Sequence, residues 1–287
     1  MNNTDKESTK PEGCSHDCGS CAASCSERKT PLNLRVPPHQ GSTIKKVIGI
    51  ASGKGGVGKS TITSLMAVAL RQQGLNVAIL DADITGPSIP KGFGLTEHAK
   101  SEDNAIVPCQ SKTGIKVMSI NLLLDDQNEP VIWRGPMIAG VVKQFWTDVL
   151  WGDIDVMLVD LPPGTGDVPL TVFQSLPLDG VVIVTSPQQL VAMVVAKAVH
   201  MAEKLAIPVL GMIENYSFIS CPKCGETIYP FGKSNTVEAA AELDLPILGL
   251  MPIDPQIASL FDSGKIESAD LKIINPMVAK ILEQINY

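Results

Sequence analysis

A glycine-rich string near the start of the chain, GKGGVGKST, contains residue types that can hold a nucleotide. It consists of Gly53, Lys54, Gly55, Gly56, Val57, Gly58, Lys59, Ser60 and Thr61. Glycines let consecutive backbone N–H groups face a phosphate, and a helix N-terminus adds partial positive charge there. We expect Lys59 to reach the β- and γ-phosphates and the Ser60 hydroxyl to bind Mg²⁺. The string predicts a phosphate-binding loop for ATP, with these nine residues forming the nucleotide site.

The residues on either side decide between this prediction and a plain glycine-rich turn. The apolar residues Val47–Ile50 precede the string, and a helical pattern from Ile62 to Leu70 follows it. A strand, a glycine-rich loop and a helix in this order are the arrangement that a phosphate site needs. The context therefore favours nucleotide binding over the plain turn.

Carboxylates follow two further apolar segments. Asp81 and Asp83 end one of them in DADITGPSIP, and Asp160 ends the other in DLPPGTGD. Ligands of α/β sheets bind at the carboxyl ends of the strands. We expect Asp160 to hold Mg²⁺, Asp83 to orient or activate the attacking water, and Asp81 to have a structural or water-mediated role. Turn-forming aspartates are the alternative for the first pair.

Two of the seven cysteines form a short Cys-x-x-Cys segment, Cys221-Pro222-Lys223-Cys224. Such a pair can be half of a zinc site, half of an iron–sulfur site or a redox dithiol. Zinc or a cubane cluster normally takes four ligands, and no histidine lies nearby in the sequence. A two-fold dimer would supply Cys221 and Cys224 twice and complete the set.

Four more cysteines crowd the N-terminus, with spacings of four, three and four residues: Cys14, Cys18, Cys21 and Cys25. They can hold a cluster or zinc, or belong to a flexible thiol-rich tail without a stable site. Cys109 stands alone, and we expect it to be a small loop or core residue.

Composition limits the kind of protein. The chain has 287 residues, a net charge of −7 and a pI near 5.1, which argues against a nucleic-acid-binding surface. No apolar segment approaches the roughly 20 residues of a membrane span. The C-terminal helical segment lacks the basic face of a membrane-binding helix. The polar first residues do not resemble a signal peptide, so we expect a cytoplasmic protein with no membrane partner.

The pattern along the chain predicts a doubly wound, mostly parallel α/β sheet. We expect a flexible cysteine-rich tail over residues 1–43, an ATPase domain over 44–287 and an insertion at about 91–130, in which only Ile115–Ile120 resembles a strand. The predicted strands are Val47–Ala51, Val77–Leu80, Val156–Val159, Val181–Thr185, Val209–Ile213 and Ile247–Leu250. The predicted helices are Thr61–Gln73, Met137–Leu150, Gln189–Leu205, Ser234–Leu243 and Pro276–Ile285.

Several strings carry a family resemblance from about Lys45 to the C-terminus. DADITGPSIP, DLPPGTGD, Trp133–Met137 and Ile213–Ser217 resemble the Mrp/ApbC family of ATP-dependent iron–sulfur cluster carriers. The lysine after the first glycine of the loop is similar to that of the deviant Walker A group containing MinD, ParA and the nitrogenase iron protein. The resemblance implies the P-loop NTPase fold of this group and a homodimer in which Lys54 reaches the partner's nucleotide.

The same resemblance implies roles for other residues. Asn215 would contact adenine, and the loop containing Pro252 and Asp254 would close over it. Cys221 and Cys224 would bind a [4Fe–4S] cluster that bridges two subunits and passes to apo iron–sulfur proteins. Eukaryotic relatives also carry four N-terminal cysteines, but with wider spacing than in this chain.

Two other functions stay open on the sequence. A MinD/ParA-like positioning switch would need no Cys-x-x-Cys segment, and a reductase like the nitrogenase iron protein would keep its cluster and cycle its charge. For Arg134, a contact with phosphate or a partner competes with a structural ion pair.

Overall fold

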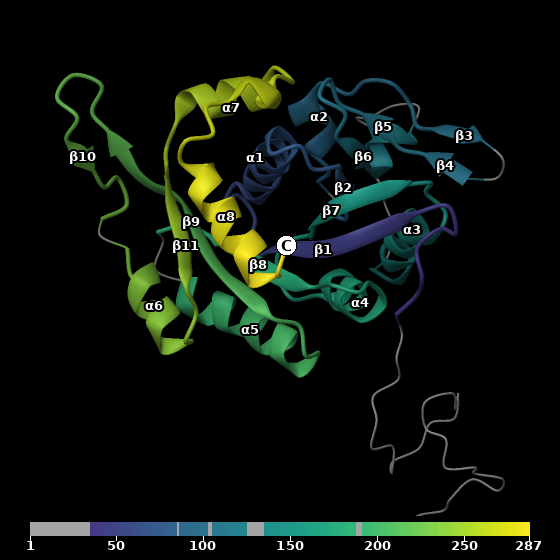
Figure 1. The fold of residues 1–287 in the computed structure, drawn as a ribbon. Helices are drawn as coiled ribbons and strands as arrows, with labels where there is room; N and C mark the ends of the chain where they lie inside the picture. Colours follow the sequence, from purple (N-terminus) through teal and green to yellow (C-terminus); the bar gives the residue numbers. More distant parts are fainter. Residues whose placement is uncertain (1–34, 85, 103–104, 125–134, 188–190, 233) are drawn as a thin grey trace, which may run out of the picture. The chain divides into compact units, whose positions relative to one another are not determined.

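The computed structural model describes residues 35–84, 86–102, 105–124, 135–187, 191–232 and 234–287 (Figure 1). Its compact unit extends from Val36 to Tyr287 and so takes in residues 36–43, which we expected in the tail. Val36 is fastened there because its N–H donates to Ser175 O and its carbonyl accepts from Trp146 Nε1, both at 2.9 Å.

A nine-stranded sheet forms the centre of the described unit, in the order β10-β9-β8-β1-β7-β2-β6-β5, with β11 also paired to β9. Every pairing except β10 with β9 and β5 with β6 is parallel, which confirms the predicted fold class. The strands are β1 Thr43–Ser52, β2 Val77–Asp81, β5 Cys109–Gln110, β6 Lys116–Met118, β7 Asp153–Asp160, β8 Gly180–Thr185, β9 Val209–Ser220, β10 Thr227–Ile228 and β11 Ile247–Pro252.

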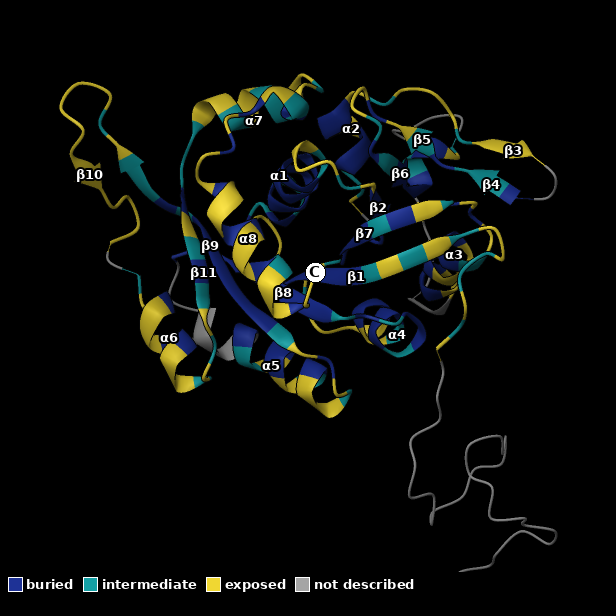
Figure 2. Ribbon diagram, in the orientation of Figure 1, coloured by how far each residue is buried: buried dark blue, intermediate teal, exposed yellow. Residues whose placement is uncertain are grey.

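Helices cover both faces of this sheet (Figures 1 and 2). Consecutive residues of a strand point to opposite faces, so Val47 packs into one apolar core and Ile48 into the other. The first core includes residues of α3 Gly135–Thr147, α4 Asp167–Ser175 and α5 Val191–Lys204, and the second includes residues of α1 Lys59–Gln72, α2 Ile89–Phe93 and α8 Ile274–Gln284. The remaining helices are α6 Thr236–Glu242 and α7 Pro255–Asp262.

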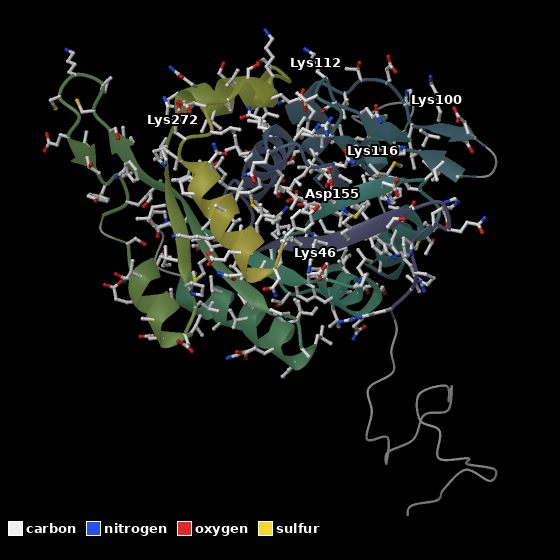
Figure 3. The ribbon with its side chains drawn as sticks, in the orientation of Figure 1. Lys46, Lys100, Lys112, Lys116, Asp155 and Lys272 are labelled. Atoms are coloured by element: carbon white, nitrogen blue, oxygen red, sulfur yellow. The ribbon has the colours of Figure 1, made fainter. Side chains whose placement is uncertain are left out.

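The insertion is more ordered than its sequence predicts. β6 lies within the predicted strand Ile115–Ile120. The insertion also forms β5 and a separate hairpin of β3 Lys100–Glu102 and β4 Ala105–Val107. These strands have two or three residues, too short for an alternating pattern to stand out. Lys116 at the start of β6 donates to Trp151 O and so fastens the insertion to the sheet (Figure 3).

Three predicted strands are clearly longer in the structure: β1, β7 and, by the most residues, β9. The strand expected at Val209–Ile213 continues to Ser220, seven residues further, because its second half pairs with β11 and β10 rather than lying in the apolar sheet centre. Helices α2, α4 and α7, of five, nine and eight residues, were not predicted. Within the described residues, no helix is both long and apolar enough to cross a bilayer.

Candidate functional site

The glycine-rich loop connects the end of β1 to the start of α1, as expected. Gly56 and Gly58 both have φ near +78°, a left-handed conformation that L-residues with side chains adopt at a cost. A Cβ on Gly58 would overlap Asn215 Nδ2 and lie 2.7 Å from Tyr216 Oη. No side chain caps the N-terminus of α1, so its first N–H groups stay available for an anion.

Lys59, Ser60 and Asp160 meet at one point. Lys59 Nζ lies 2.7 Å from Asp160 Oδ2 and 3.9 Å from Asp83 Oδ2. Ser60 Oγ donates to Asp160 Oδ2 at 2.6 Å, and Thr63 Oγ1 donates to Asp160 Oδ1 at 2.7 Å. Thr63 was missed by the sequence analysis, although it follows Ser60 by three positions and so shares its helix face.

Asp81 lies beside this cluster, at the end of the neighbouring strand β2. It is 1% exposed and pairs in register with Asp160 on the neighbouring strand. Burial, together with the charge of Asp160, raises the pKa of Asp81 to about 8, while Lys59 acts in the opposite direction. Ser119 Oγ donates to Asp81 Oδ2 at 3.0 Å, which links the insertion to the strand end.

These residues fit a Mg²⁺–nucleotide. A cavity of about 240 Å³ is lined by the loop together with Asp83, Ser88 and Pro163. Lys59 Nζ is buried at its edge and forms ion pairs but no hydrogen bond within the described part of the chain. An ammonium group has three donors, so phosphate oxygens can satisfy it. The adjacent oxygens of Ser60 and Asp160 are the ligand type that Mg²⁺ prefers.

The structure brings Asn215, Pro252 and Asp254 together in a second, smaller cavity of about 50 Å³ beside the start of α1. Asn215 is 4% exposed, and its Nδ2 donates to Val57 O in the loop at 2.9 Å. Asp254 already has a structural task, because it caps α7 by accepting from Gln256 N at 2.8 Å. The sequence analysis did not include Tyr216, which lines this cavity too.

Lys54 lines the phosphate cavity and is half-buried. Its carbonyl accepts from Ser52 Oγ at 3.1 Å, and Ser52 O accepts from Gly164 N at 2.8 Å. The segment after Asp160 is therefore hydrogen-bonded to the residue that immediately precedes the phosphate-binding loop.

Cys221 and Cys224 lie in the tight turn between β9 and β10. The turn is closed by Cys221 N donating to Glu226 O at 2.8 Å and Gly225 N donating to Cys221 O at 2.9 Å. Backbone N–H groups of Cys224 and Lys223 lower the pKa of the Cys221 thiol, which favours the thiolate that binds metals. Cys224 is exposed. No set of three or more His, Cys, Asp or Glu side chains in the described ranges is placed to hold a metal ion.

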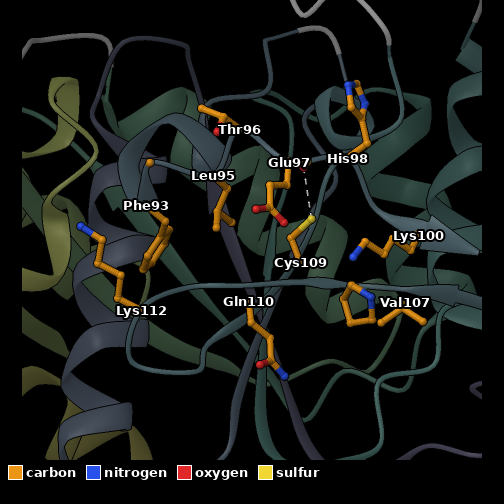
Figure 4. Close-up of a pocket in the computed structure, with 12 residues that line it drawn as sticks. Phe93, Leu95, Thr96, Glu97, His98, Lys100, Val107, Cys109, Gln110 and Lys112 are labelled. Atoms are coloured by element: carbon orange, nitrogen blue, oxygen red, sulfur yellow. Dashed lines mark hydrogen bonds between the residues drawn. The ribbon is translucent and has the colours of Figure 1, made fainter.

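Other predicted residues lie elsewhere. Arg134 and the N-terminal set of Cys14, Cys18, Cys21 and Cys25 are outside the described residues. Cys109 borders a separate cavity of about 440 Å³ in the insertion, where its Sγ donates to Glu97 O at 3.4 Å (Figure 4). Burial, followed by the charge of Glu97, raises the pKa of Cys109, so this thiol is a poor metal ligand.

Comparison with known sequences gives a consistent group of relatives. The family described as ParA, NUBPL iron-transfer P-loop NTPase, matches residues 43–286. A protein of Clostridium perfringens named iron-sulfur cluster carrier protein is 41% identical over 281 residues, covering 93% of this chain and 98% of its own. A Dictyostelium discoideum protein named iron-sulfur cluster transfer protein NUBPL is 40% identical over 255 residues, covering 85% of this chain and 78% of its own.

Solved structures agree on the fold. A nucleotide-binding protein from Archaeoglobus fulgidus, in complex with ADP, is 44% identical with a TM-score of 0.71, covering 79% of this chain and 89% of its own. MinD in the MinC:MinD cell division complex of Aquifex aeolicus is 21% identical with a TM-score of 0.61, covering 84% of this chain and 96% of the other. At that lower identity the likeness shows the fold alone.

Proposed function

This chain belongs to the family of NUBPL iron-transfer P-loop NTPases, and from that premise we propose that it is an ATP-hydrolysing iron–sulfur cluster carrier. The cluster, a [4Fe–4S] cubane, is its cargo and passes to apoproteins. The observation that carries the proposal is one strand, β9, that contains Asn215 of the nucleotide cavity and ends next to Cys221. Relatives named as cluster carriers support it.

In this proposal the buried cluster of side chains binds and positions ATP. Lys59 leaves its ion pairs with Asp160 and Asp83 for the β- and γ-phosphates, and Ser60 and Asp160 hold Mg²⁺. The metal neutralises charge on the transferring phosphoryl group. Asp83 orients the attacking water, Lys54 reaches the nucleotide of the partner, and Asn215 contacts the base edge. Pro252 and Asp254 close the base cavity.

The cargo site needs a second copy of the chain. Cys221 and Cys224 give two thiolates, whereas a cubane cluster takes four ligands. A two-fold axis through the cluster brings the same turn from each subunit together. The residues just after the turn expose large apolar side chains, namely Ile228 at 48%, Tyr229 at 48% and Phe231 at 49%, as a surface that a partner covers. Free thiolates persist in a reducing compartment, so we propose the cytoplasm as the location.

Anaerobic reconstitution with iron and sulfide tests the cargo. We expect one four-iron cluster per two chains, measured as bound iron, labile sulfide and dimer mass, and no cluster in a Cys221→Ala/Cys224→Ala variant. Removing residues 1–35, which precede the compact unit, from both proteins separates this site from any metal at Cys14, Cys18, Cys21 and Cys25. Cys109→Ala is the matched control and keeps the cluster. Zinc binding without iron, or an unchanged double variant, would overturn the carrier.

A further inference from the structure

β9 changes character in the middle of its length. From Val209 to Glu214 it pairs with β8, and from Met212 also with β11, as a mostly buried strand with a register shift against each neighbour. β11 then advances two residues, from Leu250 to Pro252, while β9 advances four, from Glu214 to Phe218. β9 therefore bulges over residues 215–217. Bulges bend a strand and redirect its side chains, and they often lie next to active sites.

The bulge faces the nucleotide cavity. It contains Asn215, whose amide donates to Val57 O, and Tyr216, whose φ is +60°. A large side chain in this left-handed conformation is uncommon and costs free energy, so surrounding contacts must hold it. The opposite wall of the cavity is attached as well, because Ile253 N donates to Phe218 O at 2.7 Å. Both sides of the cavity thus connect to Phe218, the first residue after the bulge: the bulge through the chain itself, and the 252–254 loop through this hydrogen bond.

Glu214 spans this bulge. Its side chain is 0% exposed and has no role in the nucleotide chemistry proposed above. Oε1 accepts from Ser217 Oγ, in the last residue of the bulge, at 2.5 Å. Oε2 accepts from Ser234 Oγ. Ser234 comes after the cysteines, on the segment that returns to α6, where it also accepts from Thr236 N at 2.9 Å. One buried carboxyl group therefore holds both ends of the segment that carries Cys221 and Cys224.

We propose that Glu214, with Ser217 and Ser234, is the positioning group that transmits the nucleotide state of the Asn215 cavity to Cys221 and Cys224. The inference rests on the proposed function for its purpose, but not for its geometry. A nucleotide that moves Asn215 or the 252–254 loop shifts the bulge, and the two serine contacts convert that shift into a changed orientation of the cysteine turn. Coupling of this kind requires different contacts in the two states, and the bulge is the bistable element.

The test needs no cluster. In the apo, full-length protein, alkylation rates of Cys221 and Cys224 are measured by peptide mass spectrometry with and without Mg²⁺ and a non-hydrolysable ATP analogue. We expect the analogue to change the wild-type rate about 5-fold or more, a typical coupling magnitude. In Ser234→Ala and Glu214→Gln the ratio falls to about one, while affinity for the analogue stays within about two-fold, as expected for a group that does not touch it.

Controls separate coupling from general damage. Ser263→Ala removes a serine hydroxyl that donates to Ser259 O in α7, and we expect it to keep the wild-type ratio of alkylation rates with and without the analogue. The Cys109 alkylation rate in each variant reports whether the fold has loosened. Glu214→Gln can disturb the core. If the Glu214→Gln protein does not fold, the result with Ser234→Ala decides alone.

The outcomes are distinct from those of the reconstitution. No nucleotide effect in the wild type, or an effect that both variants retain, overturns the inference. An effect lost in the variants supports it even if the protein never holds iron, in which case only the carrier function fails. If a cluster forms, its transfer rate to an apo-ferredoxin must lose its ATP dependence in Ser234→Ala.

Discussion

The nucleotide cradle, residues 53–61 with Asp83 and Asp160, and the cysteine hairpin, residues 218–231, lie at the same edge of the sheet but are built differently. Asp160 is 0% exposed and has contacts to three side chains of its own chain. Cys224 is exposed, and so are the large apolar residues Ile228, Tyr229 and Phe231 of the hairpin. Figure 2 colours the ribbon at β10 as exposed. Lys59, Ser60 and Asp160 contact one another within one chain, whereas the large apolar side chains of the hairpin are about half exposed.

This difference predicts which property of the protein a substitution changes in each region. In the cradle, Lys59 and Asp160 each contact more than one side chain, so a single change at either affects both stability and nucleotide chemistry. In the hairpin, few contacts are lost on substitution, so stability stays constant and only assembly changes. Four experiments test this contrast, from the largest expected effect to the smallest.

Lys59→Ala removes the cation that the cradle holds for phosphate. We expect ATP hydrolysis to fall by on the order of 10²–10³-fold, the usual loss when one charge-stabilising donor is removed. Phosphate release from purified protein measures it. Lys45→Ala is the control, because this exposed lysine pairs with Asp155 outside the cradle and keeps the wild-type rate. Hydrolysis by Lys59→Ala at the wild-type rate would contradict the assignment.

Gly58→Ala places a methyl group on the Asn215 amide and Tyr216. We expect the free energy of unfolding to fall by about 3 kcal/mol, part from overpacking and part from φ strain. Gly56→Ala has the same φ but meets nothing within 4 Å, so it should lose only about 1 kcal/mol. Urea unfolding of the nucleotide-free proteins gives both values. Equal losses would mean that the contact with Asn215 contributes nothing.

Asp81 makes stability depend on pH. Its pKa is raised from 3.8 to about 8, so the folded state binds its proton more tightly than the unfolded chain does. This contribution is complete below pH 4 and is lost as the pH rises toward 8, with a slope of at most about 1.4 kcal/mol per pH unit. Asp81→Asn should flatten the wild-type slope measured by urea unfolding between pH 5 and 8.

Asp155 gives the opposite case. A hydrogen bond from Lys45 and the N–H of Asn76 lower its pKa to about 2, so its contribution is present above pH 4 and is lost only in acid. Asp155→Asn should therefore leave the slope between pH 5 and 8 unchanged. A slope that Asp155→Asn flattens and Asp81→Asn does not would show that the wrong carboxyl group was identified.

Tyr229→Ser with Phe231→Ser should change the free energy of unfolding by no more than about 0.5 kcal/mol, because both side chains are half-exposed. The fraction of dimer after cluster loading, measured by light scattering, should still fall. Val237→Ser is the control, since Val237 is 57% exposed but lies on α6 outside the hairpin. An unchanged dimer fraction would leave the apolar surface of the hairpin without a role in assembly.

Sequence was sufficient where a motif marks the residue. Lys59 and Ser60 follow from a strand, a loop and a helix in succession, and Asp160 was expected beside them because ligands of α/β sheets bind at the carboxyl ends of the strands. The structure brings the three within hydrogen-bond and ion-pair distance. The parallel sheet followed from buried apolar segments.

Contacts that no motif marks were not accessible in this way. Glu214 and Ser234 are twenty positions apart, and nothing in the string ENYSF shows that β9 bulges there. Asp254 was expected only as part of the loop that closes over the adenine, yet its carboxylate also caps α7. Such assignments depend on which strand lies beside which, and a periodicity does not contain that information.

Aromatic side chains give the core on the α3 side of the sheet and the cysteine hairpin separate optical signals. Trp146 and Trp151 are buried in the core on the α3 side of the sheet, and their indole N–H groups donate to Val36 O and Phe145 O. Their fluorescence therefore follows unfolding of that core and release of Val36. The hairpin contains no tryptophan and has Tyr229 as its own chromophore. In a Trp133→Phe variant, which removes the third tryptophan, excitation at wavelengths where tryptophan absorbs and tyrosine does not records the core while the hairpin stays silent.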